Sequence, residues 1–181
     1  MTIPTLQTPH LSLRPWAAED APALFAILQE ADIFRYFPPS PPPTLEKAGR
    51  YIAHQRKHWE ERGYGHWAVV TPEDNLVVGW TGLEYLPELD EVEIAYLLSG
   101  RVRGKGYATE AARAAVEFGF GTCNLSAIIG LVHPENVPSV RVLQKCGLVF
   151  SDALTLWGLD MHRYRIRAAE CVAPAGETSP V

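Results

Sequence analysis

Small residues and positive charges gather in segment 101–110, which reads RVRGKGYATE. An apolar run at 92–98 precedes it, and small or apolar residues follow at helical spacing, so the segment joins a strand to a helix N-terminus. Unpaired amides and the helix dipole favour an anionic ligand there. Gly104 and Gly106 allow the backbone to approach that ligand closely. The sequence therefore predicts a loop that binds a pyrophosphate group.

Two well-known phosphate loops do not fit this segment. The dinucleotide fingerprint G-x-G-x-x-G needs a third glycine at the position that Thr109 occupies. A P-loop needs Ser or Thr directly after G-K, and Gly106 stands there instead. The pattern that remains is [QR]-x-x-G-x-[GA], which is met at 101–106 and again at 103–108.

A second segment, 136–148, reads NVPSVRVLQKCGL. Asn136 suits a helix cap, Pro138 suits the first helical position, and Gly147 suits a left-handed C-terminal cap. The apolar run at 127–132 before it predicts a buried strand. A second strand-to-helix unit is therefore expected beside the first.

The two segments together resemble the GNAT superfamily of acyl-CoA-dependent N-acyltransferases. The first matches the family's cofactor-binding motif, and the second matches N-x-x-S, a short helix and K-x-G-F, except that Leu148 replaces the phenylalanine. With YATEA at 107–111 and MHRY at 161–164, the likeness extends from about residue 10 to 166. It is closest to the branch that contains the ribosomal-protein-alanine N-acetyltransferases.

This resemblance implies an α/β (α+β) fold with a twisted, mostly antiparallel sheet of six or seven strands, flanked by about four helices. The sheet is expected to splay centrally, between strands ending near Leu98 and His133, and acetyl-CoA is expected to enter the splay. Backbone groups of Leu97 and Leu98 would contact the pantetheine and the thioester, and amides from Arg103 to Ala108 would bind the pyrophosphate. The full set expected to bind acetyl-CoA is Leu97, Leu98, Arg101, Arg103, Gly104, Lys105, Gly106, Tyr107, Ala108, Asn136, Ser139 and Lys145.

The expected reaction needs a base, because amines are largely protonated at neutral pH. Glu93 lies four residues before Leu97 and resembles the strand glutamate that many family members use. Glu91 shares its strand face and is the reserve choice. The open alternative is that either carboxylate is a solvated strand residue.

The expected general acid is Ser139, because Leu143 stands where many family members place a tyrosine. The Ser139 hydroxyl could donate to the departing thiolate, or it could be only a helix-start cap beside the cofactor. Asn136 is expected to be a cofactor or structural ligand. The histidines show no metal spacing, so no metal is expected.

The acceptor site has two candidate sets of residues. An acidic cluster, of which Glu84 and Glu88 are part, is either a solvated loop or a rim that attracts cationic amines. Aromatic residues form the second set, and most of them are expected in the core. The acidic set is Glu84, Glu88, Asp90, Glu91 and Glu93; the aromatic set is Phe34, Tyr36, Phe37, Trp59, Trp67, Trp80 and Tyr85.

Composition agrees with one enzyme domain at 1–168 followed by a disordered tail at 169–181. The chain has 181 residues, 47% of them hydrophobic, which suffices for a full core. A net charge of −5 argues against general nucleic-acid binding. No apolar run is long enough to span a membrane, so a cytoplasmic location is expected. Three cysteines without metal-like spacing indicate reduced thiols.

The periodicity places the remaining elements. Strands are expected at 11–14, 66–71, 76–83, 91–98, 127–132, 149–156 and 161–167, and the two N-terminal helices at 20–30 and 44–63. A stiff, proline-rich loop is expected at 38–43.

The predicted function is transfer of an acetyl group from acetyl-CoA to a primary amine by direct attack in a ternary complex. The acceptor is the α-amine of a protein or a small-molecule amine, with a preference for peptide N-termini over lysine because an α-amine is more acidic by roughly two to three pKa units. The alternative is a catalytically silent acyl-CoA-binding module, which the missing tyrosine leaves open.

Overall fold

A single eight-stranded sheet organises the chain, and the computed structural model describes residues 2–171. The strands are β1 (Leu6–Gln7), β2 (Ser12–Arg14), β3 (His66–Thr71), β4 (Leu76–Leu86), β5 (Glu91–Leu98), β6 (Ala127–Val132), β7 (Val149–Leu156) and β8 (Leu159–Arg167). The helices are α1 (Ala21–Leu28), α2 (Leu45–Arg62), α3 (Tyr107–Gly121), α4 (Val137–Lys145) and α5 (Ala168–Cys171), with short 3₁₀ turns η1 (Ala18–Asp20) and η2 (Gly100–Val102).

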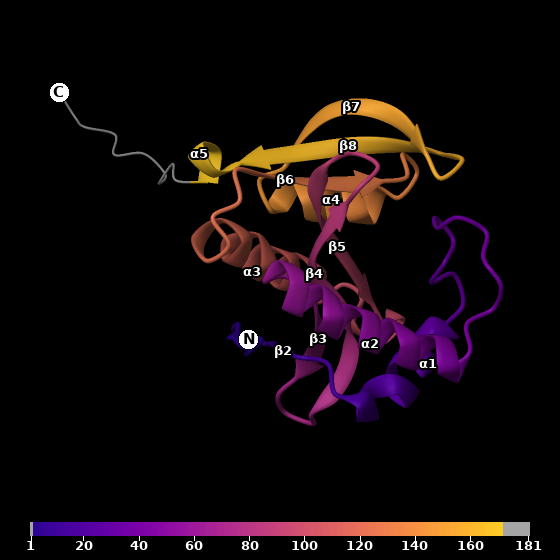
Figure 1. The fold of residues 1–181 in the computed structure, drawn as a ribbon. Coiled ribbons are helices and arrows are strands. Elements are labelled where there is room, and N and C mark those ends of the chain that lie inside the picture. The colour runs from indigo at the N-terminus through magenta and orange to yellow at the C-terminus, as the bar shows by residue number, and fades with distance from the viewer. Residues whose placement is uncertain (1, 172–181) are drawn as a thin grey trace.

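The sheet runs in the order β1-β2-β3-β4-β5-β6-β8-β7 and divides between β5 and β6. Every other neighbouring pair is antiparallel, whereas β5 and β6 are parallel and register only at Glu93 and Ile129. Figure 1 shows β6, β7, β8 and α4 as a group set apart from the strands that precede β5. The expected central splay is therefore present in the sheet.

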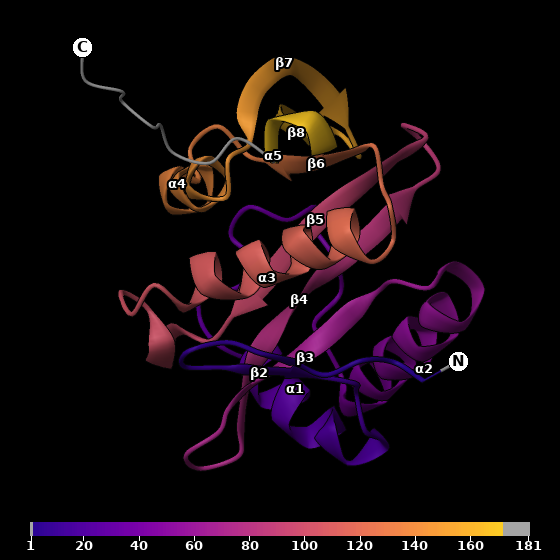
Figure 2. The same cartoon turned by 90° about the vertical axis from the view of Figure 1, so that its left-hand side faces the viewer.

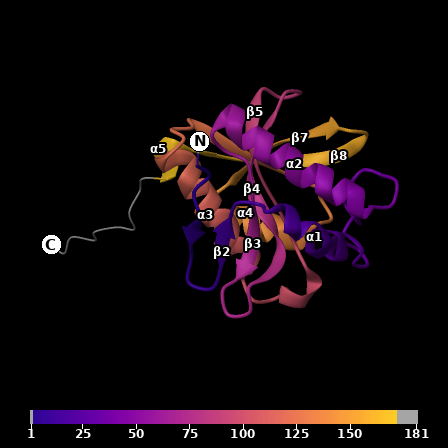
Figure 3. The same ribbon diagram turned by 60° about the horizontal axis from the view of Figure 1, so that its bottom comes forward.

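Helices cover both faces of the larger half of the sheet. Helix α3 crosses β4 and β5, as Figure 2 shows, and its small residues Ala111, Ala112 and Ala115 are fully buried against them. On the other face α1 and α2 lie together (Figure 3), where Leu24, Ile52 and their neighbours pack on Trp80 and Leu97. Burying these apolar faces is the main stabilisation of the fold.

Local sequence sets the helix ends. Helix α2 begins after Thr44, whose side chain accepts the Lys47 N–H, and ends at Gly63 with φ of 75°. After α4, the Gly147 N–H donates to Gln144 and the Leu148 N–H donates to Leu143. This pair of hydrogen bonds forms a Schellman motif, which needs the left-handed conformation of Gly147.

The expected fold class is confirmed, with three differences in detail. Strand β1 was not expected, because its two residues are too few to show a periodic pattern. Strand β4 continues to Leu86, beyond its expected end at residue 83. The chain continues past 168 into α5, and residues 172–181 of the expected tail lie outside the described residues. No helix in the described part has the length and apolar character that crossing a membrane requires.

Candidate functional site

Two adjacent cavities lie at the splay between β5 and β6 and share part of their lining. Five residues belong to the lining of both cavities: Tyr36, Phe37, Tyr96, Asn136 and Ser139. The first cavity extends from this junction to the start of α3, and the second extends to the opposite side, over β3 and β4. A molecule in each cavity could therefore meet the other at Ser139 and Tyr96.

The first cavity has a volume of about 600 Å³ and reaches the loop before α3. Gly104 and Gly106 have φ values of 78° and 81°, a left-handed conformation that glycine adopts without strain. A Cβ atom at either position would meet nothing within 4 Å, so the space in front of them is open. No side chain caps α3, and its first internally bonded N–H belongs to Glu110.

The amides of this loop fall into two groups. Arg103 and Lys105 donate to carbonyls of η2 at 3.2 and 3.5 Å, so these two N–H groups are already used. The N–H groups of Gly104, Gly106 and residues 107–109 have no acceptor in the described part of the chain. Such unpaired amides at the start of a long helix suit an anion.

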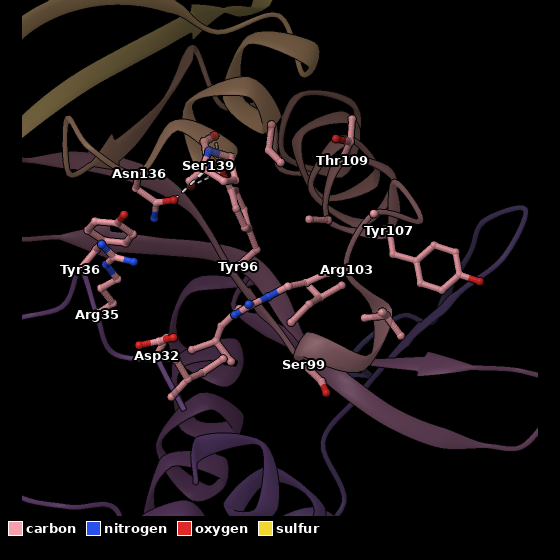
Figure 4. Close-up of a pocket in the computed structure, with 18 of the residues that line it drawn as sticks. Asp32, Arg35, Tyr36, Tyr96, Ser99, Arg103, Tyr107, Thr109, Asn136 and Ser139 are labelled. Carbon is pink, nitrogen blue, oxygen red and sulfur yellow. Dashed lines mark hydrogen bonds between the residues drawn. The ribbon is translucent and has the colours of Figure 1, made fainter. Parts of the chain in front are cut away.

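Two arginines bring positive charge to the first cavity. Arg103 comes from the loop, and Arg35 comes from the segment between α1 and α2. Figure 4 shows Arg103 reaching across the cavity towards the side on which Asp32 lies. The Tyr107 ring is directed away from the cavity and stacks on His10, with centroids 5.8 Å apart.

Three expected cofactor-binding side chains do not line this cavity. Arg101 and Lys105 are exposed on the outer side of the loop, and Lys145 is exposed at the end of α4, where its carbonyl accepts from Arg113. Arg35 lines it instead, and sequence reasoning missed that residue because it belongs to a separate loop with no phosphate motif.

The end of β5 gives the first cavity an extended backbone edge. Leu97 and Leu98 pair with Trp80 and Gly79 of β4. On their other side, β6 has already diverged, since its register with β5 stops at Glu93. The exposed edge suits an extended, amide-containing chain, and the uncapped helix start suits a pyrophosphate. The cavity therefore offers unpaired amides and a backbone edge next to the loop whose motif the sequence singled out.

Ser139 lies at the junction and is bound to a tyrosine of β5. The Ser139 Oγ and the Tyr96 hydroxyl are 2.8 Å apart, and Tyr96 also donates to the Ser139 carbonyl at 3.0 Å. Asn136 caps α4 by accepting the Ser139 N–H, as Figure 4 shows. Burial raises the pKa of Tyr96 well above its usual value, which keeps the phenol protonated.

Tyr96 is a candidate that the sequence reasoning missed. The expected place for a catalytic tyrosine was position 143, and Leu143 is buried there in the second cavity. Tyr96 supplies a phenol from a neighbouring strand to the same junction. The available signal was a tyrosine three residues after Glu93 on the central strand.

The second cavity has a volume of about 320 Å³ and contains Glu93. Glu93 Oε1 accepts the Leu131 N–H of β6 at 3.0 Å, so the carboxylate bridges the strands where their backbone pairing stops. Burial raises the pKa of Glu93 to about 8, against the lowering effect of that hydrogen bond. A carboxylate with this pKa is a suitable base for an amine.

Glu91, the reserve base, has a different environment. Arg163 donates to Glu91 Oε2 at 2.6 Å, and Arg165 donates to its other oxygen. These ion pairs link β5 to β8, and Glu91 does not line the second cavity. Both of its oxygens are occupied by arginines outside the cavity, so the geometry favours Glu93.

Glu84 and His66 stand beside Glu93 in the second cavity. The side chain of Glu84 is 31% exposed, whereas Glu88 is exposed in the following turn. Glu88 is therefore a solvated loop residue, as one of the two alternatives had it. Glu84 is not, because β4 extends beyond its expected end at residue 83 and includes Glu84. His66 is 2% exposed, and burial lowers its pKa to about 3, so the imidazole is neutral.

The aromatic candidates divide between core and cavity. Trp59 and Trp67 are buried against α3, as expected for core residues. Tyr36, Phe37 and Trp80 line the second cavity. Tyr36 also donates to the Glu135 carbonyl at 3.3 Å and holds its loop across the splay.

Comparison with known proteins agrees with this geometry. Residues 10–149 match the family model described as acetyltransferase (GNAT) domain. An uncharacterized N-acetyltransferase p20 of Bacillus licheniformis is 30% identical over 151 residues, which cover 80% of this chain and 85% of that protein.

Solved structures show the same fold. An acetyltransferase from Agrobacterium tumefaciens has a TM-score of 0.78 and 30% identity, with 92% of this chain and 96% of that one covered. The ribosomal-protein-S5-alanine acetyltransferase from Vibrio fischeri has a TM-score of 0.78 at 17% identity, with 91% and 97% covered. The structural neighbours thus include the ribosomal-protein branch that the sequence resembles.

Proposed function

The chain belongs to the GNAT acetyltransferase family and is an acetyl-CoA-dependent N-acyltransferase, and we propose that it joins acetyl-CoA and a primary amine in one ternary complex. The observation that carries this proposal is that two adjacent cavities share Ser139 and Tyr96 in their lining. One cavity has unpaired amides and arginines, and the other has carboxylates and aromatic walls. Each therefore suits one of the two substrates.

We propose that acetyl-CoA lies in the first cavity with its pyrophosphate at Gly104, Gly106 and the start of α3. Arg103 and Arg35 add charge to that end, and the edge of β5 at Leu97 and Leu98 receives the pantetheine. This direction brings the thioester to the junction beside Ser139. All of these groups are provided by the chain before any ligand binds, so binding requires little reorganisation.

Glu93 acts as the base in this scheme. The acceptor enters as an ammonium ion, and the Glu93 carboxylate takes one proton, directly or through water. The neutral amine then attacks the thioester carbonyl carbon, so that a C–N bond forms, the C–S bond breaks, and the new amide nitrogen loses its second proton to solvent. Because the pKa of Glu93 is raised to about 8, its proton affinity approaches that of the amine more closely than an ordinary carboxylate would.

Ser139 and Tyr96 act on the leaving group. The departing thiolate accepts a proton from the Ser139 hydroxyl, and Tyr96, whose hydroxyl lies 2.8 Å from Ser139 Oγ, replaces that proton. The proton that Glu93 took from the amine leaves to solvent, and solvent restores the phenol, so that acetylation of one ammonium ion releases one proton overall. No covalent bond between enzyme and acetyl group forms in this sequence.

Products from a panel of amines test the proposed function. The protein is incubated with acetyl-CoA and either peptides with free N-termini, peptides with only internal lysines, or small amines, and mass spectrometry identifies the acetylated species. We expect an acetylated amide from at least one class. Tight acetyl-CoA binding without any acetylated amine would instead support the silent binding module.

A further inference from the structure

Two carboxylates extend from one wall of the second cavity. Glu84 of β4 and Glu93 of β5 are directly opposite in the antiparallel ladder, so both side chains leave the same face of the sheet. Like charges at such opposed positions destabilise a sheet. Burial raises the pKa of both carboxyl groups, which reflects the same cost. This arrangement therefore calls for a compensating cation.

Within the described residues, the lining of the cavity supplies no such cation, and His54 of α2 acts on Glu84 only from outside that lining. That lining, as far as the chain is described, contains no lysine or arginine. Glu93 is bound by a backbone N–H, which carries no net charge. The other titratable groups that face the cavity are His66, His133 and the phenols of Tyr36 and Tyr96. A cationic ligand would supply the missing charge.

His66 gives independent evidence for a ligand at this place. It is 2% exposed and stacks on Trp80 with centroids 4.5 Å apart, so its ring position is fixed. The Tyr51 hydroxyl lies 2.7 Å from Nδ1, and a phenol can donate to that nitrogen or accept from it. In the tautomer whose hydrogen is on Nδ1, Nε2 is an acceptor that an ammonium ion can partner. Nε2 lies 3.3 Å from Glu84 Oε2 but makes no hydrogen bond in the structure. A buried polar group on the wall of this cavity thus lacks a partner.

The two carboxylates lean apart, which sets the distance between two bound charges. Glu93 reaches towards β6, where it binds Leu131, and Glu84 reaches towards β3, where it approaches His66. Neighbouring strands are about 4.8 Å apart, so side chains that lean outward from an adjacent pair separate their carboxylates by roughly two strand spacings. The apolar wall of the cavity includes Trp80, Leu86, Leu131, Leu159 and Met161.

We propose that the acceptor is a small aliphatic diamine, with the reacting amine at Glu93 and the second ammonium held by Glu84. This inference rests on the proposed function and narrows it, and it replaces the peptide α-amine that the sequence favoured. Several methylene groups between the two nitrogens match the apolar wall between the two carboxylates. Trp80 presents a further surface for the chain or for the second ammonium.

Three amines of matched length test the inference on the wild-type protein. Cadaverine, pentylamine and 5-aminovalerate differ only in whether the far end is cationic, neutral or anionic. We expect kcat/KM to be about tenfold to a hundredfold higher for cadaverine than for pentylamine, as for a charged group that gains an ionic partner, and lowest for 5-aminovalerate. Equal values for cadaverine and pentylamine would overturn the inference.

The variant Glu84→Gln tests which carboxylate holds the second charge. The ratio of kcat/KM for cadaverine to that for pentylamine should fall to near one, whereas Glu73→Gln, an exposed change in the β3–β4 turn, should keep the wild-type ratio. A wild-type ratio in folded Glu84→Gln would contradict the assignment. Acetylation of peptides but of no diamine would overturn the inference and leave the proposed function intact, and no acetylated amine of any kind would overturn both.

Discussion

The two cavities at the splay are built from different parts of the chain. The acetyl-CoA side takes most of its binding groups from one continuous segment, 97–109, and many of them are backbone N–H groups and glycines. The acceptor side takes side chains from β3, β4, β5, β6, β8 and α4. The first therefore depends on local conformation, and the second depends on how distant strands pack.

The charges of the two sides also differ. Arg35 and Arg103 line the acetyl-CoA side, and Glu84 and Glu93 line the acceptor side. An anionic and a cationic substrate are thereby directed to opposite ends of the site. A net charge of −5 over the whole chain therefore does not oppose the proposed binding of acetyl-CoA, because the local charges at that end are positive.

Changing the loop glycine should have the largest effect and should affect only the acetyl-CoA side. Gly106→Val places a branched side chain at φ of 81° in the open space in front of the amides. We expect the affinity for CoA to fall roughly a hundredfold, the loss of about 3 kcal/mol of hydrogen bonds to the pyrophosphate. Calorimetric titration with CoA measures the change.

The matched control is Gly121→Val at the far end of α3. A Cβ atom there also meets nothing within 4 Å, and the position does not need a left-handed backbone. CoA affinity should remain at the wild-type level in this variant. If folded Gly106→Val binds CoA with unchanged affinity, the loop before α3 is not the site that binds the pyrophosphate.

On the acceptor side, Glu93→Gln should lower kcat/KM roughly a hundredfold or more below pH 8, because a general base is lost. Above that pH the deficit should shrink. The wild-type rate stops rising once Glu93, with its pKa of about 8, is deprotonated, while the variant still gains from direct deprotonation of the amine. A pH series of kcat/KM for one amine measures this convergence.

Glu91→Gln sharpens the same comparison. It breaks ion pairs to Arg163 and Arg165 outside the cavity, so it should lower the melting temperature and keep the wild-type pH profile. If Glu91→Gln instead reproduces the kinetic defect and Glu93→Gln does not, the base has been assigned to the wrong carboxylate.

Variants of the two hydroxyl residues at the junction should lower the rate less than Glu93→Gln does. Ser139→Ala and Tyr96→Phe should each reduce kcat by about tenfold while CoA affinity changes little, because they act on the leaving thiolate. The double variant should cost little more than either single one, since the two hydroxyls form one relay. Additive losses in a double-mutant cycle would indicate independent roles.

The smallest expected effect is on stability, and its sign depends on pH. The folded pKa of Glu93 is raised to about 8 from its ordinary 4.5, so the unfolded chain loses this proton first and stability falls as pH rises between those values. Glu93→Gln removes this loss. The difference in melting temperature, variant minus wild type, should therefore be several degrees larger at pH 8.5 than at pH 5. A difference that does not change with pH would show that Glu93 titrates normally.

Sequence patterns were sufficient for most of the fold and for the acetyl-CoA loop. Periodicity placed β3, β5 and β6 at their observed bounds, and Thr44, Gly63 and the residues around Asn136 marked helix ends. These features depend on a few neighbouring residues. Their physical effects do not depend on the rest of the chain, which is why sequence alone revealed them.

The acceptor side was not predictable in the same way. Glu84 looked like a loop residue because the end of β4 was not recognised, and nothing in its neighbourhood indicated the contact with His66, 18 positions earlier. Tyr96 was hidden for a similar reason, because its partner Ser139 lies on α4, across the splay. Pairings between distant segments arise only when the sheet forms.

The simultaneous use of both cavities is the central claim, and initial-rate kinetics test it most directly. The concentrations of acetyl-CoA and of a free amine that the panel identifies as an acceptor are varied together, and reciprocal rates are plotted against reciprocal concentrations. Direct attack in a ternary complex predicts lines that intersect, because both substrates must be bound before any product leaves. Parallel lines would show that CoA departs before the amine binds, which would require an acetylated enzyme and contradict the account.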